Sequence, residues 1–193
     1  MNQIQSVTVY CASNQGHSPV YRQAAAELGT LLARRQIKLV YGAGGRGLMG
    51  AVADACLQAS GQVKGIIPGF MVDLEWGHKN LTDLEVVPDM TVRKELLRQS
   101  DAFIALPGGV GTLEELTEVW SWSSLNLLQQ PIGILNVNGF YDPFIQQLQA
   151  MKKEGFLTAG SLDLLLVSAE VNDLLDRLES HQHPGLAKLS SPG

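Results

Sequence analysis

Cysteine is scarce in this sequence, since Cys11 and Cys56 are the only two among 193 residues. They cannot form a disulfide framework and neither belongs to a CxxC pair, so a reducing compartment is expected. No apolar run approaches the roughly 20 residues that a membrane-spanning helix needs. Met1 to Gln5 has no basic residue, which does not fit a signal peptide. The sequence therefore predicts a cytoplasmic protein with no membrane partner.

Positive charge is also in short supply, because 14 Lys and Arg stand against 19 Asp and Glu and give a net charge of −5. A protein with this net charge lacks the excess of positive charge that duplex-binding proteins use to bind phosphates, so no nucleic acid is expected as a main partner. The length and the absence of a linker or repeat predict a single domain over residues 1–180. Helical period is lost over 181–193, where a disordered tail is predicted.

Short apolar and β-branched runs alternate with segments of helical period, which is typical of βαβ units around a parallel sheet. The sequence therefore predicts an α/β fold, with a doubly wound, Rossmann-like and mostly parallel sheet of about seven strands and helices on both faces. The predicted strands are Ser6 to Cys11, Lys38 to Tyr41, Val63 to Ile67, Leu84 to Val87, Ala102 to Leu106, Ile132 to Val137 and Leu164 to Val167. The predicted helices are Tyr21 to Arg35, Leu48 to Ala59, Thr91 to Ser100, Thr112 to Leu128, Pro143 to Glu154 and Glu170 to Ser180.

Glycine is abundant, and the first of two glycine loops covers 42–47, directly after a predicted strand. Its GxGxxG spacing lets backbone N–H groups approach a phosphate, with Gly44 and Gly45 as candidate contacts. A tight turn that needs glycines only for packing is the alternative. A dinucleotide site also requires an acidic residue after the next strand, and the segment 66–69 reads Ile-Ile-Pro-Gly. The loop therefore indicates a nucleotide ligand. The missing acidic residue disfavours an NAD-dependent dehydrogenase.

The second glycine loop reads PGGVGTLEE over residues 107–115, between a predicted strand and a predicted helix. Glycines followed by a helix N-terminus favour an anion such as a phosphate. Thr112 and Glu115 have the spacing of a capping box, in which both side chains only satisfy backbone N–H groups. Alternatively, Glu115 is an ionised carboxylate that stabilises a cationic transition state or orients water. The sequence leaves both interpretations of Glu115 open.

A third cluster follows the strand at 84–87, where Asp89 is a predicted helix N-cap and Arg93 lies four residues later. Arg93 could pair with Asp89 on the helix surface. An arginine in the first turn opposes the helix dipole, however, which favours a role on a phosphate or carboxylate. His17 and His78 are isolated, and no His, Cys or carboxylate cluster has metal-ligand spacing. The sequence therefore predicts neither a metal nor a cofactor.

These segments together resemble a known family. Residues 107–115 are similar to the PGGxGTxxE motif of the Lonely Guy family, and the MTVRK segment at 90–94 is similar to its MxxRK motif. The segments 41–50, 101–107 and 131–142 resemble the family's YGGGxxGLMG loop, DAFIALP strand and PVGLLNVxGYYD segment. Members are cytokinin riboside 5′-monophosphate phosphoribohydrolases, long labelled lysine decarboxylases. The resemblance spans residues 7–178.

The resemblance implies a homodimer that hydrolyses the N-glycosidic bond of an adenine nucleoside 5′-monophosphate. The substrate would be AMP or an N6-substituted cytokinin riboside monophosphate, and the products a free base and ribose 5-phosphate. The resemblance puts the catalytic pair on Arg93 and Glu115. The substrate contacts that it implies are Glu75, Arg93, Lys94, Gly108, Gly109, Val110, Gly111, Thr112, Leu113 and Glu114.

The sequence also leaves an alternative function open and departs from the family pattern at several positions, which include Asn14, Leu97 and the first glycine loop. A non-catalytic Rossmann-like carrier of a nucleotide or of the molybdenum cofactor would share the glycine loops. The Arg93–Lys94 pair combined with Glu115 favours an enzyme, because a carrier does not need both. Ala43 stands where the family has glycine in the first loop, and its methyl group predicts a negative φ there.

Overall fold

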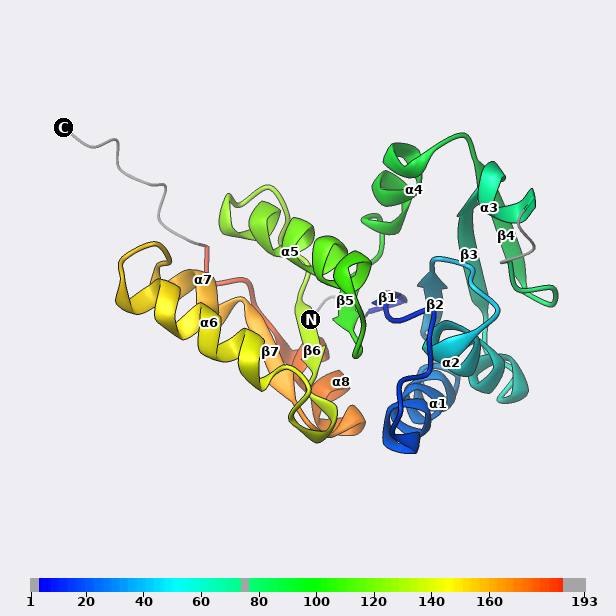
Figure 1. Cartoon of the computed structure of the whole chain (residues 1–193), viewed down its shortest axis with the longest axis horizontal. Helices are drawn as coiled ribbons and strands as arrows, with labels where there is room; N and C mark the ends of the chain where they lie inside the picture. Colours follow the sequence, from blue (N-terminus) through cyan, green and yellow to red (C-terminus); the bar gives the residue numbers. More distant parts are fainter. Residues whose placement is uncertain (1–3, 74–76, 186–193) are drawn as a thin grey trace.

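The computed structural model describes residues 4–73 and 77–185, which form one α/β unit (Figure 1). The strands are β1 (Ser6–Tyr10), β2 (Lys38–Tyr41), β3 (Val63–Pro68), β4 (Asp83–Val87), β5 (Ala102–Ala105), β6 (Ile132–Leu135) and β7 (Leu165–Ser168). The helices are α1 (Pro19–Arg34), α2 (Gly47–Gln58), α3 (Gly69–Asp73), α4 (Met90–Leu97), α5 (Val110–Ser124), α6 (Asp142–Lys153), α7 (Ala159–Asp163) and α8 (Val171–Ser180), with a 3₁₀ turn at Val137–Gly139.

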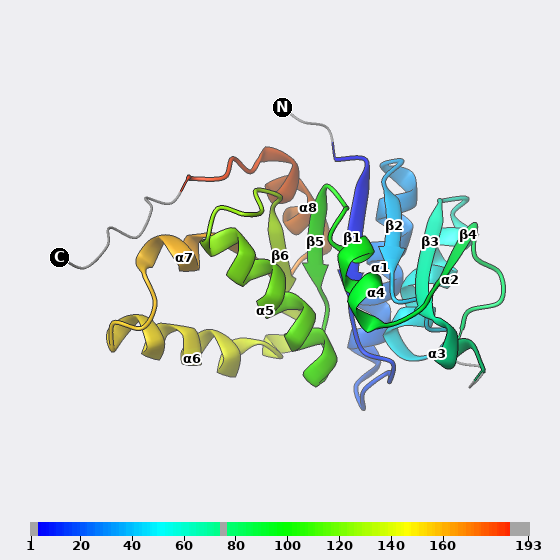
Figure 2. The same cartoon turned by 90° about the horizontal axis from the view of Figure 1, so that it is seen from above.

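The strands form one sheet in the order β4-β3-β2-β1-β5-β6-β7, and all neighbours pair in parallel. Helices α1, α2 and α8 cover one face, and α4, α5 and α6 cover the other (Figures 1 and 2). The doubly wound Rossmann-like fold predicted from the sequence is confirmed. The predicted "mostly parallel" sheet proves to be parallel throughout.

The strand β5 illustrates why these runs form a sheet covered on both sides. All four of its residues are buried, and their side chains alternate between two hydrophobic cores. Ala102 and Ile104 belong to the core under α1, α2 and α8, whereas Phe103 and Ala105 belong to the core under α4, α5 and α6. Successive side chains of a strand point to opposite faces, so an all-apolar run places apolar groups in both cores.

Capping residues define where two helices begin. The Ser18 hydroxyl accepts a hydrogen bond from the N–H of Val20, and Pro19 occupies the first helical turn of α1. At α4, the Asp89 carboxylate accepts from the N–H groups of Thr91 and Val92 at 2.8 and 3.0 Å. The predicted N-cap at Asp89 is confirmed, and it fixes the first turn of the helix that bears Arg93.

The connections after β1 and β5 determine where a ligand could bind. β1 pairs with β2 on one side and with β5 on the other, so the chain reverses its winding direction between β1 and β5. The loops after these strands meet at the carboxyl edge, where the Ala12 N–H donates to the Pro107 carbonyl at 3.3 Å. In open parallel sheets, ligands bind at this switch point.

Three short elements are not predicted by the sequence pattern: α3, α7 and the 3₁₀ turn. Each has five residues or fewer, which is too short for an apolar period to identify a helix. In the part of the chain that the structure describes, no helix combines the length and the apolar character needed to span a membrane.

Candidate active site

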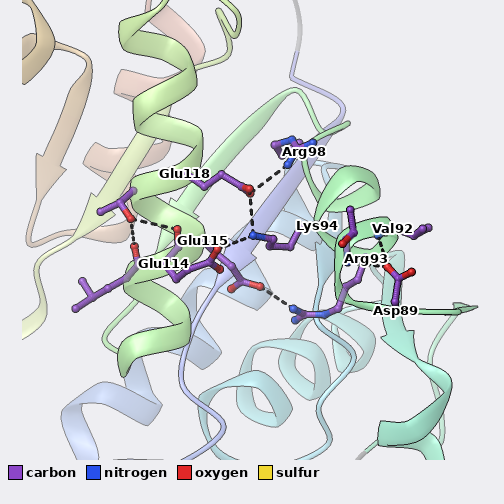
Figure 3. Close-up of polar contacts among 11 residues, drawn as sticks. Asp89, Val92, Arg93, Lys94, Arg98, Glu114, Glu115 and Glu118 are labelled. Carbon is purple, nitrogen blue, oxygen red and sulfur yellow. Dashed lines mark hydrogen bonds and ion pairs between the residues drawn. The ribbon is translucent and has the colours of Figure 1, made fainter.

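A buried ion pair joins α4 to α5 above the carboxyl edge of the sheet. Arg93 Nη1 donates to Glu115 Oε1 at 2.9 Å, and Arg93 Nε donates to the carbonyl of Ile66 in β3 at 3.3 Å. Arg93 is only 7% exposed, and the Glu115 side chain only 12%. The guanidinium also lies against Gly42, where any side chain would overlap Nη2. Figure 3 shows the two side chains pointing toward each other.

The start of α5 argues against one of the two interpretations of Glu115, the capping box. The N-cap of α5 is Gly109, and no side chain caps that helix, so the Thr112–Glu115 capping box is not formed. Asp89 caps its own helix, and Arg93 bonds across to Glu115. The two residues of the predicted catalytic pair are therefore brought together from segments 22 residues apart.

Burial is the main influence on the protonation of Glu115. Loss of water raises the pKa of this carboxyl, and the Glu114 charge raises it further. The charge and hydrogen bond of Arg93, and the Lys94 charge, lower the pKa but do not fully compensate. A carboxyl with a raised pKa beside a specific cationic partner is typical of a functional site.

The first turn of α5 carries backbone N–H groups that the helix itself cannot satisfy. Leu113 N–H donates to the Gly109 carbonyl at 3.1 Å, but within the described residues no acceptor is found for the N–H groups of Val110, Gly111 and Thr112. An added Cβ at Gly109 or Gly111 would meet no atom within 4 Å, so the backbone there is open to approach. Open amides at a helix N-terminus suit an anion.

The first glycine loop is arranged differently. The N–H groups of Leu48 and Met49, in the first turn of α2, both donate to the Ala12 carbonyl at 3.1 and 3.2 Å. Gly47 has φ +61°, and a side chain there would overlap the Ser13 backbone. Gly45 packs against the backbone at His78. This loop mainly provides close packing, which favours the second loop as the anion site.

One further sequence expectation, the backbone conformation of Ala43, has a definite outcome. Ala43 has φ +60° and is fully buried, so the prediction of a negative φ was wrong. Its carbonyl accepts a hydrogen bond from the His78 N–H at 2.8 Å, and this tertiary contact stabilises the left-handed conformation. Glu75 lies outside the described residues. Among those that are described, no group of three His, Cys, Asp or Glu side chains could hold a metal ion.

A cavity of about 350 Å³ lies beside Arg93, against the first glycine loop and the end of β3. Gly42 and Gly44 contribute to its wall. The sequence interpretation did not identify most of the residues that line it. These are Ser13, Asn14, Arg46, Met49, Ile67 and Met71. Arg46, inside the predicted loop, was the one with a visible sequence signal, because an exposed cation in a glycine loop is a candidate anion or base contact.

Lys94, Glu114, Glu118 and Arg98 form an ion-pair cluster outside the Arg93–Glu115 pair. Lys94 Nζ lies 2.5 Å from Glu114 Oε1 and 3.1 Å from Glu118 Oε1, and Arg98 Nη1 lies 3.1 Å from Glu118 Oε2. Sequence reasoning did not identify Glu118 or Arg98. The signal was present, because both helices repeat their charges at four-residue spacing, which aligns them on one face.

Comparisons with known proteins agree with the motifs. The family model described as "Possible lysine decarboxylase" matches residues 49–178. The probable cytokinin riboside 5′-monophosphate phosphoribohydrolase LOGL2 of Oryza sativa subsp. japonica is 41% identical over 91% of this chain and 72% of its own length. Cytokinin riboside 5′-monophosphate phosphoribohydrolase LOG7 of Arabidopsis thaliana is 39% identical over 91% and 82%. The chain belongs to the Lonely Guy family.

Solved structures similar to this Lonely Guy member include molybdenum-cofactor proteins. The molybdenum cofactor binding protein of Rippkaea orientalis matches with a TM-score of 0.70 and 18% identity, over 93% of this chain and 98% of that chain. The molybdenum cofactor carrier protein of Chlamydomonas reinhardtii matches with a TM-score of 0.67 and 17% identity, over 93% and 100%. At this identity the likeness shows a shared fold alone. The Lonely Guy scaffold is thus also that of carriers, and function must be argued from the site.

Proposed function

We propose that the chain is a hydrolase that cleaves the N-glycosidic bond of an adenine nucleoside 5′-monophosphate, either AMP or an N6-substituted cytokinin riboside monophosphate. The observation that supports this proposal most directly is the buried Arg93–Glu115 pair next to the open amides of α5. A carrier needs to hold a nucleotide, but it has no use for a carboxyl with a raised pKa beside it. The family's curated relatives bear the name of this activity.

The 5′-phosphate would bind at the start of α5. The N–H groups of Val110, Gly111 and Thr112 supply donors, and the helix dipole favours the negative charge. Gly108 permits this turn, since a side chain there would overlap the buried Thr112. Holding the phosphate fixes the ribose relative to Glu115 and lowers the entropic cost of reaching the transition state.

Glu115 and Arg93 would then act on the ribose. Cleavage moves the electron pair of the C1′–N9 bond onto the purine and leaves positive charge on the sugar. The ionised Glu115 stabilises that charge and orients a water molecule, whose oxygen forms the new bond to C1′ and whose proton ends on the purine. Arg93 orients the carboxylate through its hydrogen bond. The reaction needs no metal and no cofactor.

The base would occupy the cavity beside Arg93. Met49, Ile67 and Met71 give it apolar walls suited to a purine face, and Arg46 stands at its edge. Thioether and aliphatic groups contact a flat ring favourably without demanding a particular substituent. We propose in addition that the protein acts in the cytoplasm as a homodimer.

The test is product analysis with purified protein over a panel of nucleoside monophosphates, including AMP and an N6-prenylated analogue. Free base and ribose 5-phosphate should form in equal amounts. Replacement of Glu115 by glutamine should lower the rate about 10²–10⁴-fold, the scale of general acid–base effects. Tight nucleotide binding without release of base would instead support the carrier alternative.

A further inference from the structure

The cluster of Lys94, Arg98, Glu114 and Glu118 joins the two helices that bear the catalytic pair (Figure 3). Glu118 is its centre, because one carboxylate oxygen lies 3.1 Å from Lys94 Nζ and the other lies 3.1 Å from Arg98 Nη1. The Arg98 guanidinium also stacks over the Trp122 ring, 4.1 Å from its centroid. α4 is thereby attached to α5 over two successive turns.

The cluster and the catalytic pair share the same backbone. Lys94 follows Arg93 directly on α4, and Glu114 precedes Glu115 directly on α5. Arg93 is also attached to β3 through the Ile66 carbonyl, whereas among the described residues the Glu115 side chain has a single hydrogen-bond partner, Arg93. A change in the separation of α4 and α5 would therefore act directly on the 2.9 Å contact between Arg93 and Glu115.

Lys94 binds two carboxylates of the protein, those of Glu114 and Glu118, although the family resemblance implies that it contacts substrate. Its hydrogen bonds to Glu114 and Glu118 raise the pKa of the ammonium group, so it stays charged. The side chains of Lys94, Arg98 and Glu118 are 17–24% exposed. Charges partly shielded from water interact more strongly than fully exposed pairs, so this cluster can hold two helices in register.

We infer that Glu118 is a positioning residue for the catalytic pair: by binding Lys94 and Arg98 at once, it sets the distance between α4 and α5 and with it the contact of Arg93 with Glu115. This inference rests on the proposed hydrolase function. It assigns Lys94 to the same ion-pair cluster and not to the substrate.

The titratable groups around Glu115 provide a readout of this distance. They are Arg93 and Lys94 from α4, Glu114 from α5, Tyr10 at the end of β1 and Cys11 directly after it. Of these, Arg93 makes the largest contribution that lowers the pKa of Glu115. If the helices separate, the charge and hydrogen bond of Arg93 lower the pKa of Glu115 by less, whereas burial still raises it. The pKa of Glu115 should therefore rise.

The experiment compares Glu118→Gln with a matched control, Glu179→Gln. Glu179 makes a similar ion pair, 3.2 Å from Arg35 Nη1, between α8 and the end of α1 on the other face of the sheet. For each protein we would measure kcat, KM and the unfolding temperature. The pKa of the Glu115 carboxyl would be followed by NMR titration of protein with labelled glutamate carboxyls, assigned with Glu115→Gln.

We expect Glu118→Gln to lower kcat about tenfold, because small misplacements of reacting groups have effects of this size, while KM stays within about twofold. We also expect it to raise the pKa of Glu115. The control variant, Glu179→Gln, should change neither kcat nor the pKa of Glu115. The inference is overturned when kcat and the Glu115 pKa remain those of the wild type, even with a lower unfolding temperature. A higher KM at unchanged kcat overturns it too, since that result makes Glu118 a binding residue.

A second variant covers the case in which Glu118→Gln does not fold. Arg98→Gln removes the other end of the same contact and should lower kcat and raise the Glu115 pKa in the same way. The titration also separates this inference from the proposed function. A wild-type protein that releases no base contradicts the hydrolase, whereas the effect of Glu118→Gln on the Glu115 pKa tests the positioning role without turnover.

Discussion

At the scale of single residues, Glu115 combines two opposing influences. Burial favours its neutral form, whereas the proposed mechanism requires its ionised form, which Arg93 stabilises. The rate should therefore fall as the pH falls through the raised pKa of this carboxyl. We predict an acidic limb in kcat with a midpoint above the ordinary glutamate value of 4.5. A pH–rate profile with AMP measures it.

The control for this limb is the residual rate of Glu115→Gln, which should show no dependence on pH in the same range. A limb at or below the ordinary glutamate value in the wild type would contradict the assignment. It would mean that some other, more exposed carboxyl limits the reaction.

Gly47 has a backbone conformation that other residues adopt only at a cost. Its φ is +61°, and a methyl group would overlap the Ser13 backbone. Strain in the left-handed region costs roughly 1–2 kcal/mol, and the overlap adds to it, so we predict that Gly47→Ala destabilises the fold by more than about 2 kcal/mol. In a chain of this length, that corresponds to about 4–8 °C in Tm, measured by thermal unfolding.

A matched glycine provides the comparison. Gly111 lies in the first turn of α5, has no positive φ, and a Cβ there meets nothing within 4 Å. Gly111→Ala should leave the unfolding temperature unchanged or raise it, because alanine favours a helix over glycine by roughly 0.5–1 kcal/mol. Equal losses of stability in both variants would show that Gly47 is not specially constrained.

At the scale of secondary-structure elements, the amides at the start of α5 can be tested one at a time. Val110 is its first residue and its side chain is 85% exposed, so proline fits there without loss of packing. Val110→Pro removes one N–H group from the proposed phosphate site. Hydrogen bonds to charged groups contribute about 1.5–3 kcal/mol, so we predict a KM for AMP about 10–100-fold higher.

Val110→Ala is the control for this prediction, because it shortens the same side chain but keeps the N–H group. Its KM should remain close to that of the wild type. Equal KM values for the alanine and proline variants would indicate that the phosphate binds elsewhere. Circular dichroism of both variants verifies that α5 is intact.

The elements also show what the sequence could predict. β2 has the predicted bounds, and β5 ends one residue earlier than predicted, because a short, mostly apolar run followed by a glycine-rich loop has few alternatives. The ambiguity at Glu115 could not be settled in this way. The spacing of Thr112 and Glu115 is compatible with a capping box, but it does not prevent Glu115 from pairing with a residue of another helix. Only the approach of α4 to α5 distinguishes the two arrangements. For the same reason, the sequence shows the four-residue spacing of the charges on each helix but not that Glu118 and Arg98 pair with each other.

At the scale of the whole molecule, the site exists because the sheet changes its winding direction between β1 and β5. The loop after β1 contacts both glycine-rich segments: the Ala12 carbonyl accepts from the start of α2, and the Ala12 N–H donates to Pro107. The sequence predicts each segment and the parallel fold that aligns their ends. It does not predict the cavity beside Arg93, because Ser13, Met49 and Met71 come from three segments with no common motif.

The proposed homodimer is a prediction at this same scale. Three apolar side chains at the end of α5 and just beyond it are exposed: Trp122 by 38%, Leu125 by 57% and Leu127 by 67%. Clustered exposed apolar groups mark association surfaces. We predict that light scattering gives twice the 20.9 kDa of one chain and that Leu127→Lys gives the single-chain mass. Phe156→Lys, at another exposed apolar position, should stay dimeric. A wild-type protein with the mass of one chain would exclude the dimer. A dimeric Leu127→Lys would place the dimer interface elsewhere on the surface.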